Sequence, residues 1–544
     1  MNGAVMLDVM VVVVYFAAVM GIGLWVSRGN KSVEGFALGG RDIAWWAVLA
    51  SILAAEISAG TFFGAPGEGF ALRNFTYVQL ILGYLLARIV VSAVFIPAYY
   101  RHNVVSIYEF LETRFGPRTR RLSSGIFLVT RLLASGTRLW VPTVLIVMLW
   151  NLAFPNDHAS PDREFWLCGG VLVLITIATA IYTTIGGIRA VIWTDVIQIL
   201  VLVGALGFSL HYLIGHTGGW DAAKGHLFGA KIFDSGVKAD LGLWANIKGV
   251  LEQEYTLWAA FLGSTFVTLA THGTDQDMVQ RMLTAKNKNQ SAVATILSGL
   301  ADVPIVFCVL SIGMLLAVFY DANPDPLLPR SATGAVIANK AFPHFILTVM
   351  PGGLRGLVLA GVLATTMGSL STALNSLATS YVRDFHFRWF GEPETESGRV
   401  RVLRFGTILF AVLLIAVGVA TAWVSAKNPQ LRIIPIILGI FGYTYGSLLG
   451  VFMVGLFTRK RGNDAGNALA MLAAFLVVAY LSGLDHSLAG LVGEHGIPRP
   501  EWMPEIEFPW RIFFGAITSF AVAVCFRTPE ERLAKARAHL AAVA

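Results

Sequence analysis

Hydroxylated side chains recur at helical spacing in the stretch GVLATTMGSLSTALNSLATS, residues 361–380. Intervals of three and four residues place small and hydroxylated positions on one helical face: Gly361, Thr365, Ser369, Thr372, Ser376 and Thr379. Hydroxyl and carbonyl oxygens are suitable ligands for an alkali cation, and a site with little net charge favours a monovalent ion over calcium. The alternative is a helix that packs closely against others through small residues.

A second stretch, LAAEISAGTFFGAPGEGFA at residues 53–71, interrupts an apolar segment with Glu56, Ser58 and Thr61, several glycines and a proline. Backbone that leaves a helix at membrane depth is tolerated only where it is buried in protein or faces a watery cavity. The stretch therefore predicts a discontinuous helix whose freed carbonyls could bind a cation. A glycine-rich helix packed against its neighbours is the alternative.

Other polar groups enter apolar segments further along the chain. Asp195 lies near the start of an apolar run at residues 186–205, and a later run loses its apolar character at Thr268, Thr271 and His272. An ionisable group at membrane depth indicates function by default, although an acid in a first helical turn also suits the helix dipole. His272 is better interpreted as a hydrogen-bonded structural residue, because no second His or Cys stands at ligand spacing.

Arg138 and Gln79 complete the polar candidates. A buried guanidinium such as that of Arg138 is a natural anchor for an anionic solute; the alternative is a structural ion pair, for example with Glu56. Gln79 shares a helical face with Phe75, which would put a polar group beside an aromatic wall, although packing is the favoured role from the residues alone.

The elements that must position these residues are membrane-spanning helices. The chain has 544 residues, of which 56% are hydrophobic and 13% charged, against about 25% charged in soluble domains. Apolar runs of roughly 20 residues recur along the whole chain, which predicts an all-α membrane protein with about 13 transmembrane helices. The expected spans are 5–26, 44–71, 77–99, 121–150, 166–184, 190–213, 252–273, 291–319, 353–382, 404–424, 433–457, 464–483 and 510–526.

The charge pattern predicts the orientation of these spans. The net charge is +7, and basic residues concentrate in alternate loops, beginning with Arg28, Lys31 and Arg41. This bias predicts an extracellular N-terminus and a cytoplasmic C-terminus in the plasma (inner) membrane, and it makes nucleic acid an improbable partner. The three cysteines show no CxxC spacing, so metal and redox chemistry are not indicated.

Several ordered motifs make the chain resemble the sodium:solute symporter family, which contains bacterial proline, galactose and sialic-acid carriers and animal sodium/glucose carriers. The motifs are FALGGRDIAWWAVLAS, GGIRAVIWTDVIQ, THGTDQDMVQR and the hydroxylated stripe followed by Arg383 and Asp384. The resemblance implies a leucine-transporter-type core of two inverted five-helix repeats and alternating access around a midplane site. The implied parts are a leading helix and loop (1–43), a first repeat (44–213), an extracellular connection (214–251), a second repeat (252–457), two trailing helices (458–526) and a cytoplasmic tail (527–544).

The same resemblance implies the residues that bind sodium. The main site would use the carbonyls of Ala54, Ile57 and Thr365 and the side chain of Ser369, and a second site found in some members would use Asp195 with Ser369, Ser371 and Thr372. Gly368 departs from the pattern, because many members have Ser or Thr there. One expected side-chain ligand is therefore missing, and water, Thr365 or Thr372 would have to substitute.

For the solute, the resemblance is strongest to sialic-acid carriers. Their pattern of polar, aromatic and basic positions is matched here, and Thr268 and Thr271 of the polar sixth core helix join the candidates. The full set is Glu56, Ser58, Thr61, Phe75, Gln79, Arg138, Thr268 and Thr271. Arg138 would pair with a solute carboxylate, whereas Glu56 would either neutralise Arg138 or accept hydroxyl groups from a neutral sugar.

These observations together predict a sodium-coupled symporter that imports a small polar solute, with a sialic-acid-like carboxylated sugar favoured and a neutral sugar or polyol second. An intramembrane enzyme is disfavoured because no HExxH, CxxC or GxSxG element occurs. A transporter-like membrane sensor is the alternative from another class; it would be expected to carry a large cytoplasmic domain, and only a short tail follows the last expected span. Oligomeric state is not indicated.

Overall fold

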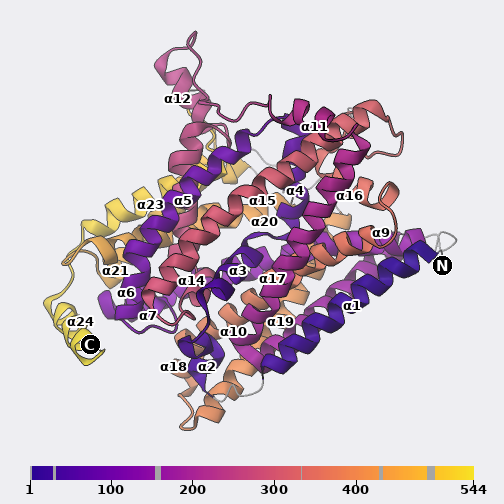
Figure 1. The fold of residues 1–544 in the computed structure, drawn as a ribbon. Helices are drawn as coiled ribbons and strands as arrows, with labels where there is room; N and C mark the ends of the chain where they lie inside the picture. The colour runs from indigo at the N-terminus through magenta and orange to yellow at the C-terminus, as the bar shows by residue number, and fades with distance from the viewer. Residues whose placement is uncertain are drawn as a thin grey trace.

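The computed structural model describes residues 3–27, 32–153, 161–331, 334–427, 433–486, 497–500 and 502–543, and these form an all-helical protein (Figure 1). The helices of the first half are α1 (Gly3–Val26), α2 (Val33–Leu38), η1 (Gly39–Arg41), α3 (Trp45–Glu56), α4 (Ala59–Leu72), η2 (Thr76–Gln79), α5 (Leu80–Val90), η3 (Val91–Phe95), α6 (Ile96–Arg101), α7 (Tyr108–Arg114), α8 (Pro117–Arg138), α9 (Trp140–Ala153), α10 (Pro161–His216), α11 (Trp220–Leu227) and α12 (Leu243–Leu251). Those of the second half are η4 (Ala259–Gly263), α13 (Ser264–Gly273), α14 (Gln276–Met282), α15 (Lys288–Ala322), α16 (Ala338–Thr348), α17 (Leu354–Tyr381), η5 (Val382–His386), α18 (Phe387–Phe390), α19 (Glu396–Lys427), α20 (Ile433–Phe457), α21 (Asp464–Leu481), α23 (Phe508–Val524) and α24 (Glu530–Val543).

Eight helices within the described residues are long and apolar enough to cross a membrane, and the bent pair of α3 and α4 makes a ninth. Helix α10 accounts for two of the expected spans, because its 56 residues would extend about 84 Å as a straight helix, far beyond a hydrocarbon layer of about 30 Å. The chain turns inside α10 at Gly187, whose φ is 57° and whose added Cβ would lie 2.4 Å from the carbonyl oxygen of Phe36. Only glycine fits both constraints.

The expected span 121–150 is divided in the structure. Helix α8 ends at Arg138 and α9 begins at Trp140, and Leu139 donates its amide to the carbonyl of Gly136 at 3.2 Å. A hydrogen bond to the third residue before it, which tightens the last turn, is common at helix ends. The division places Arg138 at the end of a helix instead of in the middle of one.

The opposite ends of the molecule carry different elements. Figure 1 shows α11 and α12, from the expected extracellular connection, at one end, and α2 and α18 near the other. Of the basic loop residues that predicted the orientation, Arg28 and Lys31 lie outside the described residues.

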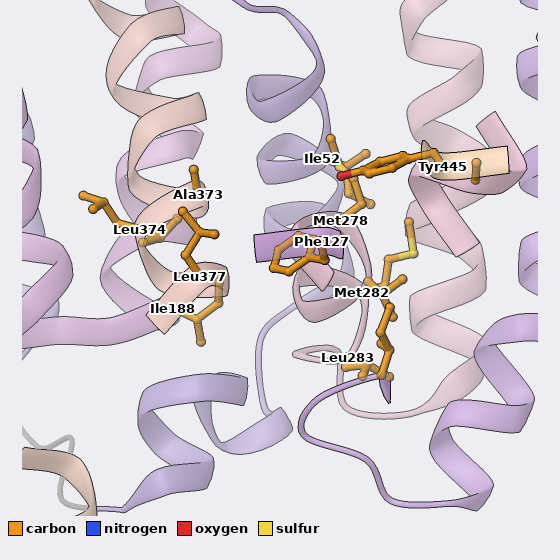
Figure 2. Close-up of a cluster of buried hydrophobic side chains, with 14 of the residues drawn as sticks. Ile52, Phe127, Ile188, Met278, Met282, Leu283, Ala373, Leu374, Leu377 and Tyr445 are labelled. Atoms are coloured by element: carbon orange, nitrogen blue, oxygen red, sulfur yellow. The ribbon is translucent and has the colours of Figure 1, made fainter. Parts of the chain in front are cut away.

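The apolar core joins helices that are distant in the sequence. Figure 2 shows side chains from α3, α8, α10, α14, α17 and α20, with Ile52, Phe127, Leu377 and Tyr445 among them. Helix α17 is buried along most of its length, so its hydroxylated stripe faces protein, as the sequence predicts for a polar face that lipid would not solvate.

Two glycines bring α4 and α15 into backbone contact. A Cβ added at Gly69 of α4 would lie 2.4 Å from the carbonyl oxygen of Leu310, and one added at Gly313 of α15 would lie 2.0 Å from that of Pro66. Neither helix can move away from this contact without opening a void, because close-packed interiors lose dispersion contacts when they separate.

Candidate cation and solute site

The helix that begins at Trp45 breaks in the middle of its span. Helix α3 ends at Glu56, Ile57 takes an extended conformation (φ −84°, ψ 92°), and α4 starts after Ser58 with a bend of 65°. Ser58 caps the new helix by accepting a hydrogen bond from the amide of Thr61 at 3.4 Å. A short side-chain acceptor followed by glycine is the local reason for the restart at this point.

The break frees backbone carbonyl groups from the hydrogen-bond pattern of the helix. In a continuous helix the amide of Ser58 would donate to Ala54, but here it donates to the carbonyl of Glu56 at 3.1 Å. The amide of Thr61, which would bond to Ile57, is capped by Ser58 instead. Two of the three carbonyls expected to bind sodium, those of Ala54 and Ile57, are thus the ones that the break removes from the helical pattern.

The hydroxyl groups of α17 face the same region. Ser369 donates to the carbonyl of Thr365 at 2.9 Å, while Ser371 and Thr372 donate to the carbonyl of Gly368 at 3.1 and 3.0 Å. Each hydroxyl keeps its lone pairs for another partner, since it uses only its proton in these bonds. Ser369 also lines a small cavity that Ser58 and Arg138 share.

Asp195 approaches the break from α10 and is fully buried. Its Oδ2 accepts from Ser51 Oγ at 2.5 Å and from Arg281 Nη1 at 2.7 Å, and Arg281 itself is fully buried. The alternative for Asp195, a simple helix-dipole role, does not account for this contact, because the structure pairs the carboxylate with an arginine of α14. The unused oxygen, Oδ1, lies 3.5 Å from the Cβ position of Gly368.

Glu56 has different partners from the one considered for it. Its Oε1 contacts Arg88 Nη2 of α5 and lies 2.7 Å from His272 Nε2 of α13, while Arg88 Nη2 also lies 2.8 Å from Asp302 Oδ2 of α15. The alternative prediction of an ion pair between Glu56 and Arg138 is therefore wrong, because the carboxylate of Glu56 pairs with Arg88. We call Glu56, Arg88, His272 and Asp302 the acid–arginine cluster.

The sequence analysis missed Arg88 and Asp302. Both are ionisable residues inside expected spans, 77–99 and 291–319, so the rule that singled out Asp195 would have found them. It would also have found Arg131, inside the expected span 121–150, which forms a buried ion pair with Asp275 of the α13–α14 break.

A cavity of about 390 Å³ lies beside the broken helix. Five of the predicted solute residues line it: Glu56, Thr61, Arg138, Thr268 and Thr271. The acid–arginine cluster forms part of the same wall, together with Tyr77, Tyr84 and Phe441. Polar groups and aromatic faces around a volume of this size are typical of a small-molecule site.

Phe75 and Gln79 lie outside the residues that line the cavity. Phe75 packs on Phe307 with ring centroids 5.2 Å apart. The buried Gln79 side chain donates to the carbonyl of Tyr255 at 2.9 Å and accepts from the amide of Asp234 at 3.0 Å. In this conformation Gln79 holds the long connection before α13 against the helix bundle.

The arrangement of two broken helices around a central site defines the leucine-transporter-type fold of secondary transporters. A sialic-acid symporter of known structure, described as sodium-coupled and in an outward-open state, aligns with a TM-score of 0.75 at 23% identity, covering 95% of this chain and 97% of that one. The nucleobase-cation symporter Mhp1 aligns with a TM-score of 0.52 over 94% of this chain and 99% of its own. These similarities confirm the predicted fold class.

The model of the sodium:solute symporter family matches residues 36–474, so the chain belongs to that family. The sodium/sialic acid symporter NanT of Aliivibrio fischeri is 27% identical over 88% of this chain and 89% of its own. Sodium/glucose cotransporter 1 of Ovis aries is 29% identical over 86% of this chain and 70% of its own. The chain is accordingly a sodium-coupled membrane symporter for a small solute, and its relatives include carriers of both acidic and neutral sugars.

Proposed function

We propose that this symporter imports a carboxylated sugar of the sialic-acid type, and that Arg138 binds the carboxylate of the solute. The observation that supports this proposal is the state of the three arginines on the wall of the large cavity: Arg88, Arg131 and Arg138. An arginine is always charged, so its availability to a solute depends on whether its guanidinium is already paired with a carboxylate of the protein.

Two of the three arginines are already paired. Arg88 contacts Glu56 and Asp302, and Arg131 contacts Asp275 and Asp277. Among the described residues Arg138 has no carboxylate partner, and its guanidinium lies 5.5 Å from the centroid of the Phe441 ring. A guanidinium on an aromatic face keeps its edge free for a bidentate carboxylate.

Sodium would couple to the solute through the broken helix. We assign the main sodium position to the carbonyls of Ala54, Ile57 and Thr365 with Ser369. A second position would use Asp195 with Ser369, Ser371 and Thr372. Because the sodium ligands and the solute residues Glu56, Ser58 and Thr61 share one break, sodium and solute would favour the same conformations of α3 and α4. Differential affinity between outward-open and inward-open states then gives coupled transport.

A neutral sugar or polyol is the second candidate. The acid–arginine cluster supports it, since carboxylate and guanidinium groups can accept from and donate to sugar hydroxyls, and a sodium/glucose cotransporter of Vibrio parahaemolyticus is 28% identical over 90% of this chain. Phe75 and Gln79 would contribute to either solute only after the connection before α13 moves. Thr268 and Thr271 suit both solutes.

The proposal includes a plasma (inner) membrane location with an extracellular N-terminus. The repeat boundaries, 44–213 and 252–457, remain predictions. They are supported by the presence of a broken helix at the start of each segment, α3–α4 in the first and α13–α14 in the second.

Uptake into proteoliposomes tests the function. A labelled sialic acid should accumulate under an inward sodium gradient, and Arg138→Gln should raise its KM by about 10–100-fold, because a charged hydrogen bond contributes about 1.5–3 kcal/mol. Arg355→Gln, which loses a buried ion pair with Asp8, is the matched control, because neither residue lines the cavity. Sodium-dependent uptake of glucose but not of sialic acid would replace the proposal by the second candidate, and equal uptake with protons or potassium would refute sodium coupling.

A further inference from the structure

Three oxygen atoms converge on the place where residue 368 lacks a side chain. A Cβ added at Gly368 would lie 2.9 Å from Gln198 Oε1, 3.3 Å from the carbonyl oxygen of Ala54 and 3.5 Å from Asp195 Oδ1. They come from α10 and α3, which face α17 at this level. Such a cluster of acceptors repels itself unless a cation or a set of donors lies among them.

Two of these side chains are buried without a partner for the atoms concerned. Gln198 is 1% exposed, and within the part of the chain that the structure describes neither Gln198 Oε1 nor Asp195 Oδ1 has a hydrogen-bond partner; the neighbouring Gln198 Nε2 and Tyr182 hydroxyl have none either. The hydroxyl groups of Tyr15 and Tyr182 lie close to Gln198 and Asp195. Most buried polar groups in proteins are satisfied, so unsatisfied oxygens that lie close to one position indicate a ligand beside it.

We infer that Gln198 supplies the sodium ligand that Gly368 cannot: Gln198 Oε1 joins Asp195 Oδ1 and the hydroxyl groups of α17 at the second sodium position, beside the Ala54 carbonyl that belongs to the main one. This inference rests on the proposed sodium coupling. A glutamine oxygen is a neutral hard ligand like the hydroxyl it replaces. Glycine at 368 is required for the replacement, since a side chain there would meet Gln198 Oε1 at 2.9 Å.

The assignment also explains why the two carboxylate oxygens of Asp195 have different surroundings. Its Oδ2 is fully used by Ser51 and Arg281, while its Oδ1 is directed to the cation. Through Asp195 and Gln198 on one side and the α17 hydroxyl groups on the other, the ion would connect α10 and α17 at a point where Arg281 of α14 also binds Asp195. Gln198 follows Asp195 by three residues, which places both side chains on one face of α10.

The test measures sodium binding by thermal shift of the purified full chain, with choline replacing sodium. Gln198→Leu should raise the sodium concentration for half-maximal stabilisation about tenfold or more, as expected for loss of a group at a metal site. Ser209→Ala, which removes another buried polar side chain of α10 bonded only to its own helix, should leave that concentration unchanged. An unchanged value in Gln198→Leu would overturn the inference.

A double variant separates ligation from packing. Gly368→Ser alone should weaken sodium binding because its side chain collides with Gln198, whereas Gly368→Ser combined with Gln198→Ala should bring the half-maximal concentration back to within about threefold of the parent, since a hydroxyl again faces the ion. Gln198→Ala alone is measured as well. If the effect of the double variant is no smaller than the product of the effects of Gly368→Ser and Gln198→Ala, Gln198 is a packing residue. If the parent protein shows no sodium-dependent shift at all, the proposed sodium coupling itself fails.

Discussion

The buried contact between Arg281 and Asp195 predicts an unusual response to mutation. Arg281→Gln leaves the Asp195 carboxylate without its counter-charge in a site with no solvent exposure. Breaking a buried ion pair by removing one partner costs about 3–5 kcal/mol of folding free energy. The same change removes a positive charge that lies roughly 6 Å from a sodium ion on the far oxygen of Asp195, a repulsion of about 3 kcal/mol at an effective dielectric constant of about 20.

The variant should therefore be less stable without sodium but bind sodium more tightly. An upper limit of about 100-fold follows from the lost repulsion, so sodium should restore much of the lost thermal stability. Thermal shift titrations with sodium chloride against choline chloride measure both effects. Arg355→Gln is the matched control: it breaks the buried pair with Asp8 and should lose stability with no change in sodium affinity. Sodium binding that weakens in Arg281→Gln would refute a cation at Asp195 Oδ1.

Two further predictions concern the cavity wall and the α4–α15 contact. Arg88→Met should destabilise the protein by about 3–5 kcal/mol, because Glu56 and Asp302 would face each other without a counter-charge. Adding Glu56→Gln and Asp302→Asn should recover most of the lost stability in a thermal denaturation assay. No recovery would show that Arg88 acts through packing. Gly313→Ala should prevent accumulation of folded protein, measured by size-exclusion profile in detergent, because its Cβ would lie 2.0 Å from the carbonyl oxygen of Pro66, whereas Gly204→Ala, on α10 with open space around it, should be tolerated.

Local features of the site were predictable from sequence. Glycine and serine after Glu56 predict the interruption of the first core helix, and the hydroxyl spacing of 361–380 predicts a buried polar face on α17. Both follow from short-range chemistry, since capping and helical periodicity depend on residues only a few positions apart. The all-helical membrane fold follows from composition and apolar run length for the same reason.

The partners of the charged residues were not predictable in this way. Glu56 could have met Arg138 or Arg88, which are both arginines in neighbouring spans, and only the relative rotation of α3, α5 and α8 decides between them. Gln198 gave no signal because an amide on an apolar helix resembles many interhelical hydrogen bonds. Its significance appears only when the absent side chain of Gly368 is placed opposite it.

The backbone contact between α4 and α15 constrains how this carrier can open. Gly69 and Gly313 hold α4 and α15 in close backbone contact. A rotation of α4 about Ile57 would therefore move α15 with it. Helix α15 carries Asp302, which belongs to the acid–arginine cluster and lines the cavity. The movement that opens the cavity would therefore also change the shape of its wall. Release of the solute and rearrangement of its wall would then be one mechanical event.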